Sequence, residues 1–362
     1  MDTRGLVDAG LTFSQQSVQK RQEAIQYAEA RGAKIIISAG GATEHIEHFF
    51  EGSVAQSTAY GADYGTRAAQ AAIDLGLHGV DFDLELAPGN NGPFHSGHMQ
   101  AFCVAASAAA RSVLQKWWKF EKEKLLFFQE NWKKNLHFQF FTIFTTFSPS
   151  GSIISHAPQA PYLGSWAGDD LGYTGILARG ELDVDFLNIQ FYNQGAHETY
   201  QSLFVDHQQD HWLDNSSIGE MIQNGVSADK IVVGKYSREA LVSVLSFSII
   251  LGINPQKCCT KIDQKKPKNR IHWLRNSLIR APLTYLRDDS GEYYASNGFV
   301  APEVLNQWTC SFEADTANEV AGFMVWMYAG PSDNSILEWG KLVNQQCWIN
   351  VLKNWWTYGF NF

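Results

Sequence analysis

Three acidic side chains alternate along one short stretch of the chain. Asp81, Asp83 and Glu85 lie in the segment HGVDFDLEL at residues 78–86. This pattern favours a β-strand, in which successive side chains point to opposite faces, so the three acids share one face and the apolar residues between them share the other. Three like charges inside a fold cannot all stay ionised without large pKa shifts, and catalytic acids and bases use such shifts. The alternative is a solvent-facing acidic edge strand, with the apolar residues inside.

Six segments of apolar and β-branched residues predict strands, and helical patterns such as residues 15–32 and 66–75 lie between most of them. The predicted strands are residues 34–39, 79–86, 152–156, 185–192, 230–234 and 322–328. Helices alternating with strands predict an α/β fold. An open doubly wound sheet would suit this pattern, but no GxGxxG follows a strand, and polar residues at the strand ends favour a TIM (β/α)8-type barrel.

Composition excludes several classes of protein. The chain has 362 residues, 45% of them apolar, and a formal charge of −9. A chain of this kind buries a large core, so we expect one large globular domain, and nucleic-acid binding through a general basic surface is disfavoured. The longest apolar stretch, residues 241–253, is shorter than the roughly 20 residues that span a bilayer. The sequence as written starts without a signal peptide pattern.

The five cysteines do not have metal-site spacing. We therefore expect no metal, and nothing in the sequence calls for a cofactor. A disulfide between Cys310 and Cys347 remains open beside free buried thiols, because sequence alone cannot pair cysteines.

Two segments differ in composition from the rest. Residues 116–134 hold six Lys against three Glu, and residues 257–280 hold eight Lys and Arg against one Asp. We interpret them as parts of inserts at about 116–147 and 236–285, with solvated faces favoured over a site for an anionic partner. The predicted organisation is a catalytic barrel over residues 1–335 that carries both inserts, followed by a helix and aromatic tail at 336–362.

Four motifs occur in the order found in glycoside hydrolase family 18, which includes chitinases and endo-β-N-acetylglucosaminidases. Asp81, Asp83 and Glu85 match the last three acids of its D-G-x-D-x-D-x-E motif, and His78 stands where the first Asp is expected. The other three are SAGG at residues 38–41, which resembles the S-x-G-G of the third strand, QFYN at 190–193, which resembles the sixth-strand motif, and Trp326, which resembles the eighth-strand tryptophan. The resemblance covers residues 15–115, 152–235 and 300–335.

The resemblance implies a role for each site residue. In this family the N-acetyl oxygen of the substrate attacks the anomeric carbon, so Glu85 would act as the general acid and then the general base. Asp83 would hold the N-acetyl N–H and stabilise the oxazolinium-like intermediate, while Asp81 shares a proton with it. Tyr192 would donate to the acetyl oxygen. The expected sugar contacts are Trp326, Gln190, Gln159 and Gly41.

The implied function is retaining hydrolysis of β-1,4-linked N-acetylglucosamine, in chitin, chitooligosaccharides or the chitobiose core of N-glycans. The chain would act as a monomer on these sugars, without nucleic-acid or membrane partners, and would be secreted if a leader precedes it. The alternative is a lectin-like relative without catalysis, or an inactive fragment. The family has two strands before the S-x-G-G strand, and we expect the first and most or all of the second to be missing here, because the residues before Lys34 leave room for little more than a helix.

Overall fold

The computed structural model describes residues 8–30, 33–41, 44, 46–86, 92–132, 152–167, 172–192, 194, 199–207, 213–236, 300 and 302–326.

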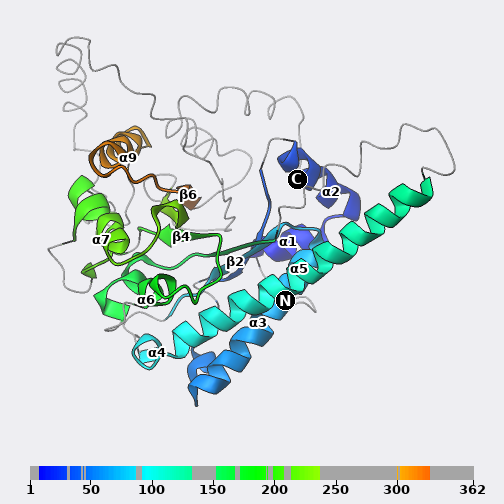
Figure 1. Ribbon diagram of the computed structural model, residues 1–362, viewed down its shortest axis with the longest axis horizontal. Coiled ribbons are helices and arrows are strands. Elements are labelled where there is room, and N and C mark those ends of the chain that lie inside the picture. The colour runs from blue at the N-terminus through cyan, green and yellow to red at the C-terminus, as the bar shows by residue number, and fades with distance from the viewer. Residues whose placement is uncertain are drawn as a thin grey trace, which may run out of the picture.

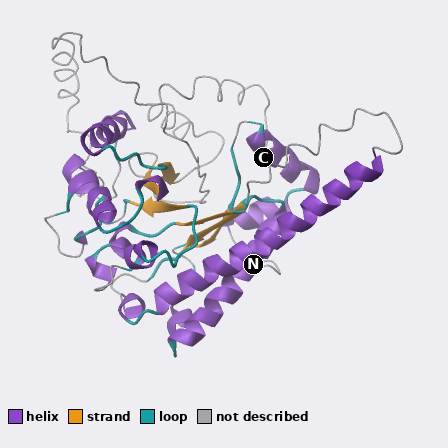
Figure 2. Ribbon diagram, in the orientation of Figure 1, coloured by secondary structure: helices purple, strands orange, loops and turns teal. Residues whose placement is uncertain are grey.

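The strands form one parallel sheet that follows the order of the sequence. They are β1 (Ile37–Gly40), β2 (Gly79–Asp83), β3 (Ile153–His156), β4 (Phe186–Gln190), β5 (Ile231–Tyr236) and β6 (Gly322–Trp326). Each strand pairs in parallel with the next, from β1 to β6. Figure 2 shows this sheet in the centre of the molecule with helices around it. Parallel strands in sequence order, with helices on the outside, are the arrangement of a TIM barrel.

Helices connect most of the strands. They are α1 (Asp8–Gln15), α2 (Val18–Glu29), α3 (Val54–Leu75), α4 (Gly92–His95), α5 (His98–Trp132), α6 (Tyr173–Ala178), α7 (Ile218–Gln223) and α9 (Pro302–Thr316), with single turns such as Glu47–Phe50 and Ala160–Leu163 between some of them. Figure 1 shows α3 lying along α5, whose far end extends beyond the rest of the labelled elements.

Local sequence explains how α3 begins, ends and packs. Ser53 and Gln56 form a capping box at its start, and Gly76 ends it in the left-handed conformation, with φ 74°. A side chain at Gly65 would overlap the carbonyl oxygen of Ala106 in α5. This glycine therefore lets the two helices approach closely, and the helix pair covers the outer face of the sheet.

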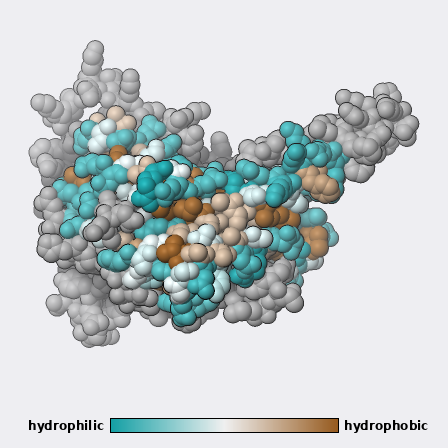
Figure 3. All heavy atoms as spheres, turned by 60° about the horizontal axis from the view of Figure 1, so that its bottom comes forward, coloured by the Kyte–Doolittle hydropathy of each residue, from teal (hydrophilic) through white to brown (hydrophobic). Residues whose placement is uncertain are grey.

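The outer face of β2 is apolar and buried under these helices. Val80 and Phe82 are fully buried, and the Phe82 ring lies 6.1 Å from the ring of Tyr64 in α3. Apolar residues at alternate positions of β2 therefore face the helices, which leaves the acidic positions on the inner face. The molecular face that carries α3 and α5 mixes hydrophilic and hydrophobic residues, and Figure 3 shows a band of apolar residues bordered by hydrophilic ones.

The sequence predicted all six of these strands, with ends shifted by a few residues. One shift matters for the site: β2 ends at Asp83, so Glu85 lies just beyond the strand instead of in it. Beyond the strand, the Leu86 N–H donates to the Tyr162 hydroxyl at 2.9 Å. The helix predicted at 66–75 is also longer and begins at Val54.

The predicted inserts are covered only in part. Residues 116–132 continue α5 without a break, so the described part of the first insert is the end of a barrel helix. Residues 133–147, 237–285 and the tail at 336–362 lie outside the described residues, and the domain boundaries stay a prediction. Cys347 also lies outside them, so its pairing with Cys310 stays untested.

Among the helices described, none combines the length and the apolar character that crossing a membrane requires.

Candidate active site

The acids of β2 point into the barrel and are buried. Asp81 is 2% exposed and Asp83 is 5% exposed. The alternative of a solvent-facing acidic strand is therefore wrong. Glu85 follows at the carboxyl end of the strand, where it is partly exposed. The carboxyl ends of the strands are where TIM-barrel enzymes carry their active sites.

Neutral donors from three other strands surround the Asp81 carboxyl. Ser155 of β3 donates to its Oδ1 at 2.6 Å, and Asn188 of β4 donates to the same oxygen at 2.9 Å. Ser38 of β1 donates to Oδ2 at 3.2 Å. Burial raises the pKa of Asp81, and these hydrogen bonds oppose that rise because they favour the charged form.

Gln190 links the other two acids. Its Nε2 donates to Asp83 Oδ1 at 2.7 Å, and the same nitrogen lies 3.5 Å from Glu85 Oε1. It also donates to the backbone oxygen of Ala157 at 2.8 Å, which fixes the orientation of the amide. A side chain that is 3% exposed thus joins the end of β4 to the end of β2.

Gln159 completes the surroundings of Glu85. It lies after β3, pairs with Gln190 as an isolated bridge, and donates from Nε2 to Glu85 Oε2 at 3.2 Å. The Glu85 carboxyl is therefore held by amides from both sides. The two glutamines that the sequence singled out as sugar contacts lie within reach of the acids.

Burial and like charge shift the acids in one direction. Burial raises the pKa of Asp83 well above its usual value, and the charges of Glu85 and Asp81 raise it further, against a lowering by the Gln190 hydrogen bond. Burial also raises the pKa of Glu85, while Gln190 and Gln159 oppose the rise. The pKa shifts of these carboxyls are therefore toward the protonated form, which is the form that a general acid needs.

Two glycines bring β1 close to the acids. Gly40 has φ 114°, and a side chain there would overlap the backbone oxygen of Asp83. The Gly41 N–H donates to that same oxygen at 2.6 Å, and a Cβ at Gly41 would lie 3.7 Å from Asp83 Oδ2. Gly41, predicted as a substrate contact, thus lies beside the carboxyl of Asp83.

The structure places the two predicted aromatic residues further around the barrel. Tyr192 follows β4, is 3% exposed and packs against Val232 of β5 and Met324 of β6. Trp326 is the last residue of β6 and pairs with Tyr236 of β5. Its side chain lies outside the described residues. Tyr192 has the same strand parity as Gln190, and so shares the inner face with it.

Sequence patterns did not predict three residues that contact the site. Ser155 and Asn188 contact Asp81, and Tyr162 holds the chain after β2. Asn188 could have been found, because it lies two residues before Gln190 and so on the same strand face. Tyr162 comes from a turn, where no periodicity indicates the direction of its side chain.

His78, which stands where the family motif has its first Asp, makes its hydrogen bonds at the starts of β1 and β2. Its Nε2 is 2.8 Å from Glu29 Oε1 in α2, and its Nδ1 contacts the backbone of Ile35. It joins the starts of β1 and β2 to the outer helix layer.

Within the described ranges, no group of three or more His, Cys, Asp or Glu side chains is arranged to hold a metal ion. What the site offers is a partly exposed carboxyl at the barrel mouth, a second carboxyl below it, and amide donors between them. Such a set can deliver a proton to a leaving group and stabilise positive charge that develops beside it.

Comparison with known families gives a match over most of the chain. The model described as glycosyl hydrolases family 18 matches residues 7–328. A search of curated proteins finds no match.

Solved structures of chitinases are similar to this chain at low sequence identity. A GH18 chitinase from Pseudoalteromonas aurantia is 18% identical, with a TM-score of 0.47 over 89% of this chain and 78% of that one. A putative chitinase A from Streptomyces coelicolor is 14% identical, with a TM-score of 0.45 over 91% and 77%. A GH18 chitinase from Cycas revoluta, solved in complex with (GlcNAc)3, is 14% identical, with a TM-score of 0.43 over 87% and 80%.

Proposed function

This chain belongs to glycosyl hydrolase family 18, and we propose that it hydrolyses β-1,4-linked N-acetylglucosamine in chitin or chitooligosaccharides. The observation that carries the proposal is the row of carboxyls along and just after β2: Asp81 and Asp83 in the strand, and Glu85 beyond its end, with the Gln190 amide 2.7 Å from Asp83 and 3.5 Å from Glu85. The mechanism of this family asks for one proton donor and for a carboxyl that orients the N-acetyl group, and these acids offer both.

Glu85 is the general acid of the proposed reaction. It is the acid nearest the barrel mouth, and burial raises its pKa, which favours the protonated form that a general acid needs. It gives this proton to the glycosidic oxygen as the bond to the anomeric carbon breaks. As an anion it then takes a proton from the water that attacks the anomeric carbon.

Asp83 is the carboxyl that orients the substrate. The N-acetyl oxygen attacks the anomeric carbon and forms an oxazolinium-like ring, whose positive charge the Asp83 carboxyl stabilises through the acetamido N–H. Asp81, held by hydrogen bonds from three neighbouring strands, shares a proton with Asp83. No carboxylate of the enzyme has to bond to the sugar.

Tyr192 and Trp326 complete the proposed sugar site. Tyr192, on the inner face, donates its hydroxyl to the acetyl oxygen and positions it for attack. Trp326, at the carboxyl end of β6, provides an apolar wall for the sugar ring. Gln190, Gln159 and Gly41 contact the sugar beside the acids.

Turnover of a soluble oligosaccharide tests the proposal. The full chain is incubated with chitotetraose, and the anomeric form of the first products is followed by proton NMR. Attack by the acetyl oxygen and then by water inverts the anomeric carbon twice, so we expect the initial product to be the β-anomer. Initial α-anomer would contradict the substrate-assisted scheme.

The Glu85→Gln variant assigns the acid. It keeps the shape of the side chain and removes the transferable proton, so we expect kcat to fall at least about 10³-fold while chitotetraose binding persists. Glu23→Gln is the matched control, because Glu23 is exposed on α2, far along the chain from β2. Binding without turnover by the unmodified chain would instead support a lectin-like relative.

A further inference from the structure

One asparagine of the chain lies in the sequence pattern that accepts N-linked sugars. The pattern is Asn, then any residue except Pro, then Ser or Thr, and Asn215-Ser216-Ser217 matches it. Among all the asparagines of the sequence, Asn215 alone has Ser or Thr two residues later. Because so short a pattern also arises by chance, the assignment depends on how the fold presents this asparagine.

Asn215 lies in a turn directly before α7. Its φ of 66° is in the left-handed region, which asparagine adopts more readily than most residues with a side chain. Ser217 is the N-cap of α7, which begins at Ile218. Asn215 is partly exposed, whereas Leu213, Ser216 and Ser217 around it are fully buried. The turn therefore brings this asparagine to the surface while it buries the side chains on both sides.

The two ends of the Asn215 amide differ in their contacts. Its Oδ1 accepts from the Nδ2 of Asn224, the residue that ends α7, at 3.2 Å. Among the described residues, none forms a hydrogen bond with the Nδ2 of Asn215, and this nitrogen is not one of their fully buried polar atoms. Attachment of a sugar replaces one hydrogen of Nδ2 and leaves Oδ1 as it is. An attached sugar would therefore remove no hydrogen bond from the described fold.

We propose that Asn215 carries an N-linked oligosaccharide when the chain is made in the secretory pathway. The donor is an oligosaccharide joined through a diphosphate to a polyprenyl lipid. The Asn215 Nδ2 forms a bond to C1 of the first sugar as the bond from C1 to the diphosphate breaks. The lipid diphosphate leaves with the electron pair, and a base of the transferase takes the amide proton. This modification goes beyond the proposed hydrolysis and does not depend on it.

The hydroxyl at the third position of the pattern is used by the fold. Ser217 is 0% exposed, and its Oγ donates to Glu220 Oε2 at 2.6 Å and accepts from the Glu220 N–H at 3.2 Å. These contacts form the capping box at the start of α7. The transferase recognises this hydroxyl, so it has to act before the capping box forms. We therefore expect the sugar to be added during synthesis and not to the folded protein.

The turn that carries Asn215 lies at the end of the barrel that carries the acids. The segment from β4 to α7 leaves the sheet at the carboxyl end of β4, where Gln190 reaches Asp83. The backbone oxygen of Asp214 accepts from the Ser165 N–H at 2.9 Å, in the segment that follows β3. An oligosaccharide on Asn215 would therefore start from a turn that is fixed at this end of the barrel.

Expression of the full chain behind a cleavable secretory leader in a eukaryotic cell line tests the proposal. We expect most of the chain to migrate as a slower band on a denaturing gel, and peptide-N-glycosidase F to remove the shift. This enzyme leaves Asp in place of the asparagine that carried the sugar, so peptide mass spectrometry should find the conversion at Asn215. A chain without a removable sugar, or with the sugar at another residue, would overturn the proposal.

Three variants assign the shift to this site. Asn215→Asp removes the acceptor nitrogen and keeps an oxygen for the Asn224 amide, so we expect the slower band to disappear while the chain still folds. Ser217→Thr keeps both the pattern and the capping hydroxyl, and the band should remain. Asn224→Ala is the matched control, because it breaks the hydrogen bond to Asn215 without changing the pattern. A slower band in Asn215→Asp, or its loss in either of the other two variants, would contradict the assignment.

A second measurement tests whether the folded chain accommodates the sugar. The secreted, glycosylated chain is compared with secreted Asn215→Asp by thermal unfolding. Because the Asn215 Nδ2 has no hydrogen-bond partner among the described residues, we expect the melting temperature of the glycosylated chain to equal or exceed that of the variant. A glycosylated chain that melts well below Asn215→Asp, or that is retained in the cell while the variant is secreted, would overturn the inference.

Discussion

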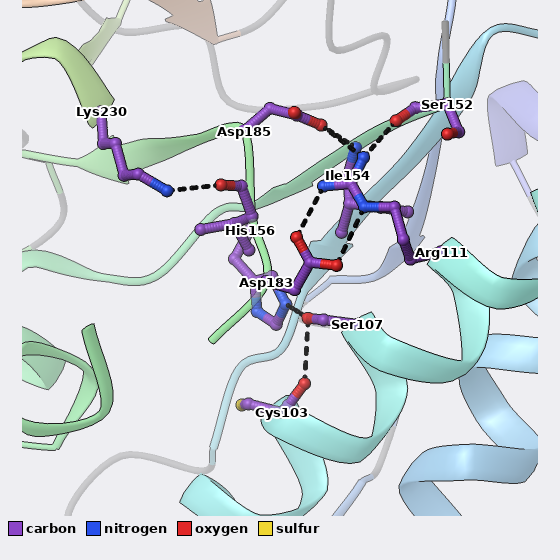
Figure 4. A network of polar contacts seen from close by, with 10 residues as sticks. Cys103, Ser107, Arg111, Ser152, Ile154, His156, Asp183, Asp185 and Lys230 are labelled. Atoms are coloured by element: carbon purple, nitrogen blue, oxygen red, sulfur yellow. Dashed lines mark hydrogen bonds and ion pairs between the residues drawn. The ribbon is translucent and has the colours of Figure 1, made fainter. Parts of the chain in front are cut away.

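The two faces of the same strands both bury polar side chains, but they do so differently. On β3, Ser155 points inward to Asp81, while the next residue, His156, points outward to the helices. Figure 4 shows the outer network, in which His156 contacts Ser107 of α5 and Arg111 of the same helix reaches Asp183 and Asp185. Neighbouring residues in the chain thus belong to two separate buried polar clusters.

The outer cluster is matched in charge and in hydrogen bonds. His156 lies 2.7 Å from the Ser107 hydroxyl and 3.0 Å from the Tyr173 hydroxyl, and burial lowers its pKa to about 3, so the ring is neutral. Arg111 lies 3.1 Å from Asp183 and 3.0 Å from Asp185. Hydrogen bonds to a neutral ring and an arginine between two carboxylates hold these side chains in place, so we interpret the outer cluster as part of what stabilises the fold.

The inner cluster is unmatched. It places three carboxyls along one side of β2 with amide and hydroxyl donors, and their pKa values all rise. Buried like charges lower the stability of a fold. Carboxyls with shifted pKa values therefore concentrate at sites whose chemistry uses their protons. The comparison therefore separates residues kept for chemistry from residues kept for the fold, although both clusters contain buried polar side chains such as Asp81 and His156.

The same change made on each face tests this separation, and the larger effect is expected on the inner face. Asp83→Asn keeps the shape and removes one of the three like charges. We expect kcat on chitotetraose to fall about 10²-fold, because the carboxylate that stabilises the oxazolinium-like ring is lost. The melting temperature at pH 7 should not fall. An unchanged kcat in Asp83→Asn would show that Asp83 has no role in the mechanism.

The matching change on the outer face is Asp185→Asn. Asp185 Oδ2 accepts from Arg111 at 3.0 Å and from the Ile154 N–H at 2.8 Å. We expect a loss of about 1–2 kcal/mol in the free energy of unfolding, because charged hydrogen bonds are replaced by weaker ones. The kcat per folded molecule should stay unchanged. Urea unfolding measures the free energy of unfolding, and rates normalised to folded protein measure kcat. A large loss of kcat would contradict the separation of the two faces.

The pH dependence of stability gives a third comparison. The folded pKa of Asp83 is raised above its unfolded value, so the protonated form favours the fold, and stability is lost as the pH rises through the folded pKa. Asp83→Asn removes this loss. We therefore expect the melting temperature of the variant, relative to the unmodified chain, to increase from pH 5 to pH 8. A difference that is constant over this range would mean that Asp83 does not titrate there.

The sequence predicts the inner cluster well because the strand period of two determines which side chains share a face. Asp81, Asp83 and Gln190 come together as this period requires. The same reasoning predicts an outer layer of apolar residues, and Phe82 fits it.

The outer polar cluster could not be predicted in this way. His156 and Arg111 lie in an apolar strand and a long helix, and their partners are far away in the sequence, so neither spacing nor composition indicates the contact. The contact of Tyr162 could not be predicted either. Its hydroxyl accepts from the Leu86 N–H, and that contact depends on tertiary packing. Sequence patterns report local periodicity, and these contacts are set by how helices dock on the sheet.

The titration of His156 has the opposite sign to that of Asp83. Burial lowers its pKa from 6.5 to about 3, so the unfolded chain binds a proton between these values that the folded chain does not. Stability is therefore lost as the pH falls below about 6.5, by about 1.4 kcal/mol for each unit until the folded pKa is reached. His156→Gln removes this titration and keeps a side chain that can hydrogen-bond to Ser107.

We expect the unmodified chain to be more stable than His156→Gln at pH 7, because the variant disturbs a packed ring, and this advantage should shrink by about 1.4 kcal/mol at pH 5.5. Thermal or urea unfolding of both proteins from pH 7 to pH 4.5 measures the trend. The inner acids lose stability as the pH rises, and the outer histidine loses it as the pH falls. An advantage of the unmodified chain that stays constant toward acid would show that His156 is protonated in the folded state, and the outer cluster would then carry a charge that its neutral partners do not match.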